Sequence, residues 1–413
     1  MNGRPDRARG EAYGAMQAGD SAIGVIARSR FLRAAVIALF CSGLGVSSVT
    51  PQLTLFLVEE LHASLPVAGL YYLTNLAAPV AGYLVGRRSD RSTDRLAMFR
   101  VCAVVGAAGW VVIGLAQAIW VPFVISILAL SIGGAAMGQL FAACRDELSR
   151  HPTTVDNQVI ALVRMAFTAG WVLGPVLGSW YGSVAGLRPM VFATAALVLL
   201  QILPLGRQRV PRFHRPGDPG PAPDPGGRRM LPLLIFMAMI VLAMAGDTMK
   251  FGYLPIYMEQ QLQLSPLLRG AVIGVQPLLE FALMPLAARL ADRFGALRVL
   301  PVGVAFGVTG NLTFAFSSDA VGLFAGQLQI ALLWACIGAL GVTIAQDLYP
   351  ERVATASGLF MSTIPVAGAV GGLIGGIAVG TFGLPRVYLL PAGLTLIGCV
   401  GLVVLDRALR RRT

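Results

Sequence analysis

Long apolar runs fill the chain from about residue 34 almost to its end, and short polar breaks separate them. Each run has about 20 residues or more, the length at which an α-helix crosses the hydrocarbon core of a bilayer. Helices are required because backbone polar groups in hydrocarbon must find hydrogen-bond partners within their own segment. The pattern predicts spans at 34–57, 65–86, 97–118, 121–144, 158–181, 188–206, 231–257, 267–290, 298–317, 320–345, 354–380 and 384–405.

A polar stretch divides these twelve spans into two sets of six. Residues 207–229, RQRVPRFHRPGDPGPAPDPGGRR, are rich in proline, glycine and charge and show no apolar periodicity. This composition is typical of a flexible linker. The predicted regions are a tail at 1–30, a six-helix half at 31–206, the linker at 207–229, a second half at 230–406 and a basic tail at 407–413.

The two halves repeat at a constant offset of 201 residues. Asp146, which closes the fourth span, matches Asp347, which closes the tenth. Further matches are Gly69 with Gly270, Gly106 with Gly307, Gly170 with Gly371, and Gly174 with Gly375. Two parallel six-helix repeats resemble the architecture of the major facilitator superfamily. We therefore predict an all-α membrane protein with twelve transmembrane helices in the major facilitator fold.

Composition and charge agree with a membrane protein. Apolar residues make up 56% of the chain and charged residues 13%, whereas a soluble domain carries about 25% charged residues. The net charge of +12 does not indicate a nucleic-acid partner, because its placement follows topology. With the N-terminus inside, 27 basic residues lie in cytoplasmic segments and 3 in outside loops. The bias predicts that both termini are cytoplasmic.

The residues that usually build enzyme or metal sites are few and scattered. The five cysteines lie in or at the ends of apolar runs without metal-ligand spacing, and the three histidines lie outside the spans. No HExxH, phosphate loop or paired carboxylate–histidine cluster is present. We expect no enzyme activity, no metal and no cofactor. The expected energy source is the proton gradient.

Four charged residues lie more than five positions from either end of a predicted span, where a central charge costs about 2.5–3.5 kcal/mol and needs a partner or a water-filled cavity. Asp247 and Lys250 lie three residues apart on one helix face and can neutralise each other. Glu280 has no opposite charge within four residues, and Arg164 lies in the fifth span. Glu280 is the candidate for exchanging a proton or contacting substrate, with a structural hydrogen bond as the alternative. A structural role is equally open for the Asp247–Lys250 pair.

Charged residues at the predicted cytoplasmic helix ends are candidates for gating. The second loop carries Asp90 and Arg91, and the eighth carries Asp292 and Arg293. The eighth loop resembles the major facilitator signature, in which an aspartate and arginines clamp neighbouring helices in one state; the second loop departs from it. Asp146 and Asp347 are further gating or helix-capping candidates. The alternative for each arginine is a purely topological role.

Small residues and amides in the spans suggest close packing and a polar cavity. Gly170, Gly174 and Gly178 recur at spacing four around Pro175, which lets helix backbones approach. Amides near aromatic rings suit a neutral polyol, because they bond hydroxyl groups while a ring faces the sugar plane. Interhelical hydrogen bonding is the alternative for each amide. The amide candidates are Gln52, Asn75, Gln139 and Gln276.

Several stretches together resemble the bacterial sugar efflux transporters, the Set family of the major facilitator superfamily. They include Pro51–Leu57, Gln139–Asp146, Val163–Met165 with a matching Arg164, and Ala354–Phe360. Glu280 also matches, whereas Asp247-Thr-Met stands where the family tends to carry Asn-Thr-Met. The resemblance implies a bacterial inner-membrane exporter of sugars or small glycosides, exchanging them for protons.

The alternative on the same scaffold is a multidrug or antibiotic exporter. A mainly aromatic and aliphatic cavity would favour drugs, whereas clustered amides favour sugars. We expect a small-molecule substrate, the lipid bilayer as surroundings and a monomer.

Overall fold

The computed structural model describes residues 21–89, 91–92, 94–211 and 227–411, and these fold almost entirely into helices. A short helix, α2, precedes the first span and begins at Ser21, whose hydroxyl accepts from the Gly24 amide. The helices of the first half are α2(Ala22–Arg28), α3(Arg30–Val49), η1(Thr50–Gln52), α4(Leu53–Glu59), α5(Leu65–Leu70), η2(Tyr71–Leu76), α6(Ala77–Ser89), α7(Arg95–Gly114), α8(Trp120–Ile125), η3(Ser126–Leu130), α9(Ser131–Gly134), α10(Ala136–Arg150), α11(Asp156–Ala185), α12(Leu187–Leu200) and η4(Leu203–Leu205).

The second half is more regular. Its helices are α13(Gly227–Ile256), η5(Tyr257–Gln261), α14(Pro266–Phe294), α15(Ala296–Phe316), α16(Ala320–Leu348), η6(Pro350–Arg352), α17(Val353–Met361), α18(Thr363–Phe382), η7(Arg386–Tyr388) and α19(Leu389–Arg410). Long helices here keep interior prolines, among them Pro277 and Pro285 in α14. Neighbouring helices can support a proline-interrupted helix in a membrane.

Within the described residues, 11 helices are long and apolar enough to cross a membrane. The remaining predicted span, 65–86, is also helical but runs as three consecutive pieces, α5, η2 and α6. The first and fourth spans are interrupted as well, by η1 at Pro51 and by the π-helical turn η3. The prediction of an all-helical membrane fold is confirmed, and the sequence pattern did not reveal these interruptions.

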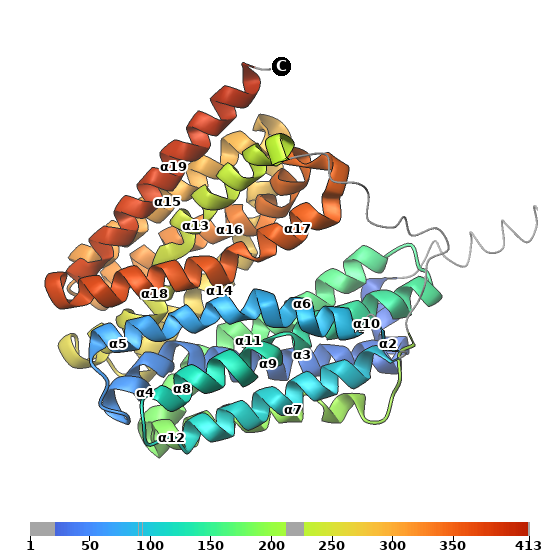
Figure 1. Cartoon of the computed structure of the whole chain (residues 1–413), viewed down its shortest axis with the longest axis horizontal. Helices are drawn as coiled ribbons and strands as arrows, with labels where there is room; N and C mark the ends of the chain where they lie inside the picture. Colours follow the sequence, from blue (N-terminus) through green and yellow to red (C-terminus); the bar gives the residue numbers. More distant parts are fainter. Residues whose placement is uncertain (1–20, 90, 93, 212–226, 412–413) are drawn as a thin grey trace, which may run out of the picture.

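The two halves form separate bundles that meet at one end (Figure 1). In the figure, α13, α15, α16, α17 and α19 lie in one bundle, and α3, α7, α10 and α12 lie in the other. The bundles approach each other near α5 and α18 and diverge toward the end where α2, α10 and the C-terminus lie. The second half has one continuous apolar core, whereas the first half has two core clusters along its length.

Glycines let the halves touch at the end away from the linker. A Cβ added at Gly69 would lie 2.6 Å from the Cα of Gly376, so the backbones of α5 and α18 are in direct contact. A Cβ at Gly274 would lie 2.6 Å from the carbonyl oxygen of Val172 on α11. Small residues at such positions allow the close approach that dispersion forces between helices require. The end away from the linker is therefore the tightly packed side of the inter-half interface.

A second set of glycines packs helices within each half. A Cβ at Gly170 would lie 2.7 Å from the Phe40 carbonyl oxygen, and one at Gly174 would overlap Ser47 on α3. Gly178 likewise faces Ser48, and the Ser47 hydroxyl donates to the Gly170 carbonyl over 3.0 Å. The matching glycines of the second half, Gly371 and Gly375, face α13 in the same way, at Ala245 and at Met249 and Tyr253. In both halves, glycines therefore let the fifth helix of the repeat pack closely against the first, α11 against α3 and α18 against α13.

Candidate functional site

The most concentrated polar group inside the spans surrounds Lys250 on α13. The Lys250 ammonium, 1% exposed, lies 2.5 Å from Asp247 Oδ1 on the same helix. The indole nitrogen of Trp334 on α16 donates to the same aspartate oxygen over 3.2 Å. A buried ammonium is tolerated when it is paired and its protons are used. The i,i+3 spacing seen in the sequence therefore does produce a contact.

Gln276 on α14 extends this group to the next helix. Its side-chain oxygen accepts from Lys250 Nζ over 2.5 Å, and its side-chain nitrogen donates to Glu280 Oε2 over 3.2 Å. The polar network therefore runs Trp334–Asp247–Lys250–Gln276–Glu280 across three helices. Along its own helix Glu280 has no opposite charge within four residues, but in space the Lys250 ammonium from α13 lies one amide away.

Arg164 brings the other half of the molecule to this network. It lies on α11, is exposed, and is close enough to Glu280 to interact with it electrostatically, as are Asp247 and Lys250. Aromatic rings span the same boundary. The Phe251 ring lies 4.4 Å from Lys250 Nζ and 6.1 Å from the Trp171 ring on α11. We define the central site as Arg164, Asp247, Lys250, Gln276, Glu280 and Trp334.

The other amide candidates are not part of this network. Gln52 is buried in η1 and Asn75 lies in η2, where its amide faces Gly368 of α18. Gln139 is buried in α10, and none of the described residues gives its side-chain oxygen a hydrogen bond. The same is true of the buried indole nitrogen of Trp171. Such unsatisfied groups are costly unless a ligand or water completes them.

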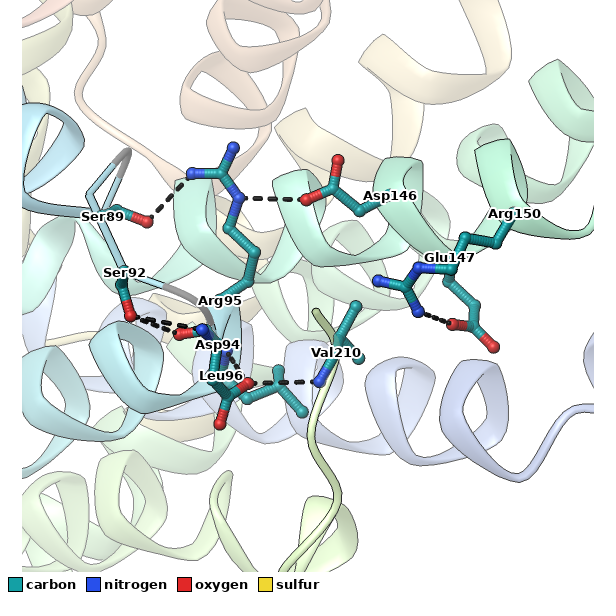
Figure 2. Close-up of polar contacts among 9 residues, drawn as sticks. All are labelled: Ser89, Ser92, Asp94, Arg95, Leu96, Asp146, Glu147, Arg150 and Val210. Atoms are coloured by element: carbon teal, nitrogen blue, oxygen red, sulfur yellow. Dashed lines mark hydrogen bonds and ion pairs between the residues drawn. The ribbon is translucent and has the colours of Figure 1, made fainter. Parts of the chain in front are cut away.

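A second polar cluster joins the second, third and fourth spans at the linker end (Figure 2). Arg95, the first residue of α7, donates to Asp146 Oδ2 on α10 over 3.0 Å and to the Ser89 hydroxyl over 3.0 Å. Both charged side chains are largely buried, at 12% and 15% exposure. Glu147 and Arg150 pair on the outer side of α10. Asp146 therefore joins two helix ends rather than standing alone.

The first residues of the predicted linker belong to this cluster. Asp94 Oδ1 accepts from the amides of Leu96 and Val210 (Figure 2). The Arg95 amide also donates to the Val210 carbonyl oxygen. Arg100 donates to the carbonyl oxygens of Gly206 and Gln208. The segment leaving the sixth span is thus fastened to the start of the third.

The remaining gating candidates are not brought together in the same way. Asp90 lies outside the described residues. Arg91 lines an open pocket with Arg87 and Arg88, while Asp292 and Arg293 are exposed at the end of α14. Asp347 is exposed beside a pocket that Arg298 also lines. The repeat explains the difference, because the position 201 residues after Arg95 is Ala296.

Sequence reasoning missed Arg95 and Trp334 as members of these clusters. The signal for Arg95 was its place at a helix start beside Asp94, but its partner lies 51 residues further along. No sequence signal links Trp334 to Asp247, which is 87 residues away. Among the described residues, no group of three or more histidine, cysteine, aspartate or glutamate side chains could hold a metal ion.

Two helical bundles that meet around a partly buried charged site are the architecture of a membrane transporter. The sequence profile of the Major Facilitator Superfamily matches residues 35–234 and again residues 235–413, once per half. The chain belongs to this superfamily and is a multi-pass membrane protein that transports a small molecule.

Relatives within the superfamily include named sugar exporters. The chain is 25% identical to sugar efflux transporter B of Salmonella typhimurium, over 83% of this chain and 87% of that protein. It is 25% identical to sugar efflux transporter A of Escherichia coli, over 86% and 90%. A weaker match is multidrug resistance protein MdtG of Dickeya zeae, 25% identical over 89% and 92%.

The fold also matches a solved transporter. The nucleoside transporter NupG superposes with a TM-score of 0.77 at 15% sequence identity, covering 91% of this chain and 99% of that one. At this identity the match supports the fold alone.

Proposed function

We propose that this chain exports sugars or small glycosides across the bacterial inner membrane by proton antiport with alternating access. The observation that carries the proposal is the central site, where Arg164 of one half lies within electrostatic range of Glu280 of the other. The named sugar exporters among its relatives support the substrate class. The protein acts as a monomer, with both termini in the cytoplasm, as the 27-to-3 distribution of basic residues predicts.

In the proposed cycle, Glu280 is the group that exchanges the proton. Within the described part of the chain its carboxylate accepts one hydrogen bond, from the Gln276 amide, and it is partly buried between α11, α13, α14 and α16. A carboxyl group in such surroundings can change protonation with modest rearrangement, since one amide rather than an ion pair holds it. Rocking of the halves about the glycine contacts at Gly69 and Gly274 then exposes the central site alternately to each side.

The substrate would bind against Trp171 and Phe251, whose rings meet between the halves. The unpartnered Trp171 indole nitrogen offers a donor to a hydroxyl group, which a purely apolar drug cannot use. The same rings also suit a flat apolar molecule, so the multidrug alternative keeps a physical basis in this aromatic pair. Hydroxyl-rich ligands are favoured because they satisfy the buried donor.

The decisive experiment is transport by the full chain in proteoliposomes with an imposed pH gradient, using a panel of labelled sugars and glycosides and one cationic dye. We expect a pH gradient to accumulate at least one sugar or glycoside. Glu280→Gln, which keeps the shape and loses the titration, should retain counterflow exchange of that sugar but lose accumulation. Asp319→Asn is the matched control, because Asp319 caps α16 outside the central site. Dye transport with no sugar transport would refute the proposed substrate class. A gradient without effect on the unchanged protein would refute antiport.

A further inference from the structure

The orientation of the Gln276 amide is fixed by its two neighbours. On one side Lys250 Nζ lies 2.5 Å from the amide oxygen, and on the other Glu280 Oε2 lies 3.2 Å from the amide nitrogen. An ammonium group has three donors and no acceptor, so the atom facing it must be the oxygen. The nitrogen must then face Glu280.

The reverse orientation is excluded by two repulsive contacts at once. Rotating the amide would place its NH2 group against the Lys250 ammonium and its oxygen against the Glu280 carboxylate. Lys250 cannot turn away without cost, because its side chain is 1% exposed and also pairs with Asp247. A hydrogen-bond donor is therefore held against Glu280 as long as Lys250 is present.

We propose that Lys250 is a positioning residue that sets the proton affinity of Glu280 through the fixed orientation of Gln276. An amide donor stabilises the ionised carboxylate, whereas the O–H of a protonated Glu280 would find no acceptor on this amide. The network thus favours proton release from Glu280 without any contact between Lys250 and the carboxylate. We call this action of Lys250 on Glu280 through Gln276 the relay. Its role in transport rests on the proposed function, in which Glu280 is the group that exchanges the proton.

Other charges that face Glu280 are few. From α13 they are Asp247 and Lys250, and from α11 Arg164. On α16, a Cβ at Gly338 would lie 3.6 Å from Glu280 Oε1, and the one charged residue of that helix is Asp347, nine positions further along. Arg164 is unchanged in every variant below. Removing Asp247 and Lys250 together leaves the net charge unchanged, but the two charges act on Glu280 in opposite senses and from different positions. Gln276→Leu changes no charge and therefore isolates the effect of the amide.

The test is a pH titration of Glu280 itself in the purified full-length protein, followed by the infrared band of its protonated carboxyl group. The band is assigned by its loss in Glu280→Gln. In the double variant Asp247→Asn with Lys250→Met, the titration midpoint should rise by about one pH unit, a tenfold gain in proton affinity, because a hydrogen bond to a charged group is lost or randomised. Gln276→Leu should produce a similar rise.

Combining the variants distinguishes a relay from separate effects. The triple variant combines Asp247→Asn, Lys250→Met and Gln276→Leu. Its midpoint should rise no further than that of Gln276→Leu alone, because the loss of Gln276 already removes the path from Lys250 to Glu280. Lys250→Arg keeps a cationic donor for the Gln276 oxygen and should leave the midpoint within a factor of two in proton affinity. Gln327→Leu is the matched control and should leave the midpoint unchanged, because it removes a buried amide of α16 that makes no hydrogen bond with any residue the structure describes.

An unchanged midpoint in Gln276→Leu, or shifts that add in the triple variant, would overturn the proposal. Gln276→Leu alone decides the matter if the double variant does not fold. The titration needs neither substrate nor gradient, so it is independent of transport. If the variants shift the titration but the unchanged protein shows no gradient-driven transport, the antiport function is refuted and the relay is supported. If the unchanged protein shows gradient-driven transport but the variants leave the titration unshifted, the relay is refuted.

Discussion

Arg95 Nε lies 3.0 Å from Asp146 Oδ2 and thereby joins the start of the third span to the end of the fourth. The Ser89 hydroxyl, at the end of the second span, accepts from the same guanidinium. One side chain therefore holds three consecutive helices of the first half at the linker end. The matching position of the second half is Ala296, whose methyl side chain cannot make this contact.

Breaking this contact should destabilise the first half. We expect Asp146→Asn to lower the free energy of unfolding by about 1.5–3 kcal/mol, since a largely buried charged hydrogen bond is lost. Thermal unfolding of the purified protein would measure it. Asp406→Asn is the control, because its i,i+4 pair with Arg410 lies on a partly exposed helix end and such pairs contribute about 0.3–0.5 kcal/mol. Equal losses in the two variants would contradict a special role for Asp146.

Enlarging Gly69 should prevent the halves from closing at the end away from the linker. A leucine there would overlap the Gly376 backbone, and backbone cannot move aside cheaply. We expect transport to fall at least tenfold while the amount of inserted protein stays normal, because leucine is favourable in lipid. Distances between spin labels on α5 and α18 should increase.

Gly82→Leu provides the comparison for Gly69→Leu. It lies on the continuation of the same span, and a Cβ there would meet nothing within 4 Å. Transport near the normal rate is expected in this variant. If both leucine variants lose transport equally, the contact between Gly69 and Gly376 is not the cause.

A side chain added at Gly174 should destabilise the protein by overlapping Ser47, and a second substitution at Ser47 should reduce this effect. Gly174→Ala would force its methyl group into the Ser47 side chain, so we expect a lower unfolding temperature and slower transport. Adding Ser47→Gly removes the overlapping Ser47 atoms, while the Leu44 carbonyl oxygen stays 2.9 Å from the new Cβ. The double variant should regain part of the stability, although the hydrogen bond to Gly170 is lost. Thermal unfolding of the single and double variants tests this; a double variant less stable than Gly174→Ala would contradict it.

The orientation in the membrane can be tested with single cysteines in a cysteine-free background. Cysteines at the exposed positions Glu59 and Asp319 should react with a membrane-impermeant thiol reagent added to intact cells. A cysteine at the exposed Arg209 should react only after the cells are opened. Labelling of Arg209→Cys in intact cells would reverse the predicted topology.

The apolar pattern was sufficient to predict the helical membrane fold, because each span is a local apolar run. The repeat could be predicted because a single offset of 201 residues relates the two halves. It could not reveal η1, η2 or η3, since a short 3-10 or π turn leaves the apolar run unbroken. The Asp247–Lys250 contact followed from helical spacing alone. The contact of Lys250 with Gln276 did not, because it depends on how α13 and α14 are rotated against each other. The same holds for Arg95 and Asp146, which are separated by 51 residues.

The four charged groups of the central site also determine how membrane voltage would act on the proposed cycle. Asp247 and ionised Glu280 balance Lys250 and Arg164, so the site carries no net charge when it holds a neutral sugar. Proton binding to Glu280 makes the same site singly positive. The electric field, which acts with about 2.3 kcal/mol per elementary charge at 100 mV, would then act on the proton-bearing step and leave the sugar-bearing step unaffected. An exporter built this way would draw on the membrane potential as well as the pH difference, and its turnover would rise with voltage even when the two compartments have the same pH.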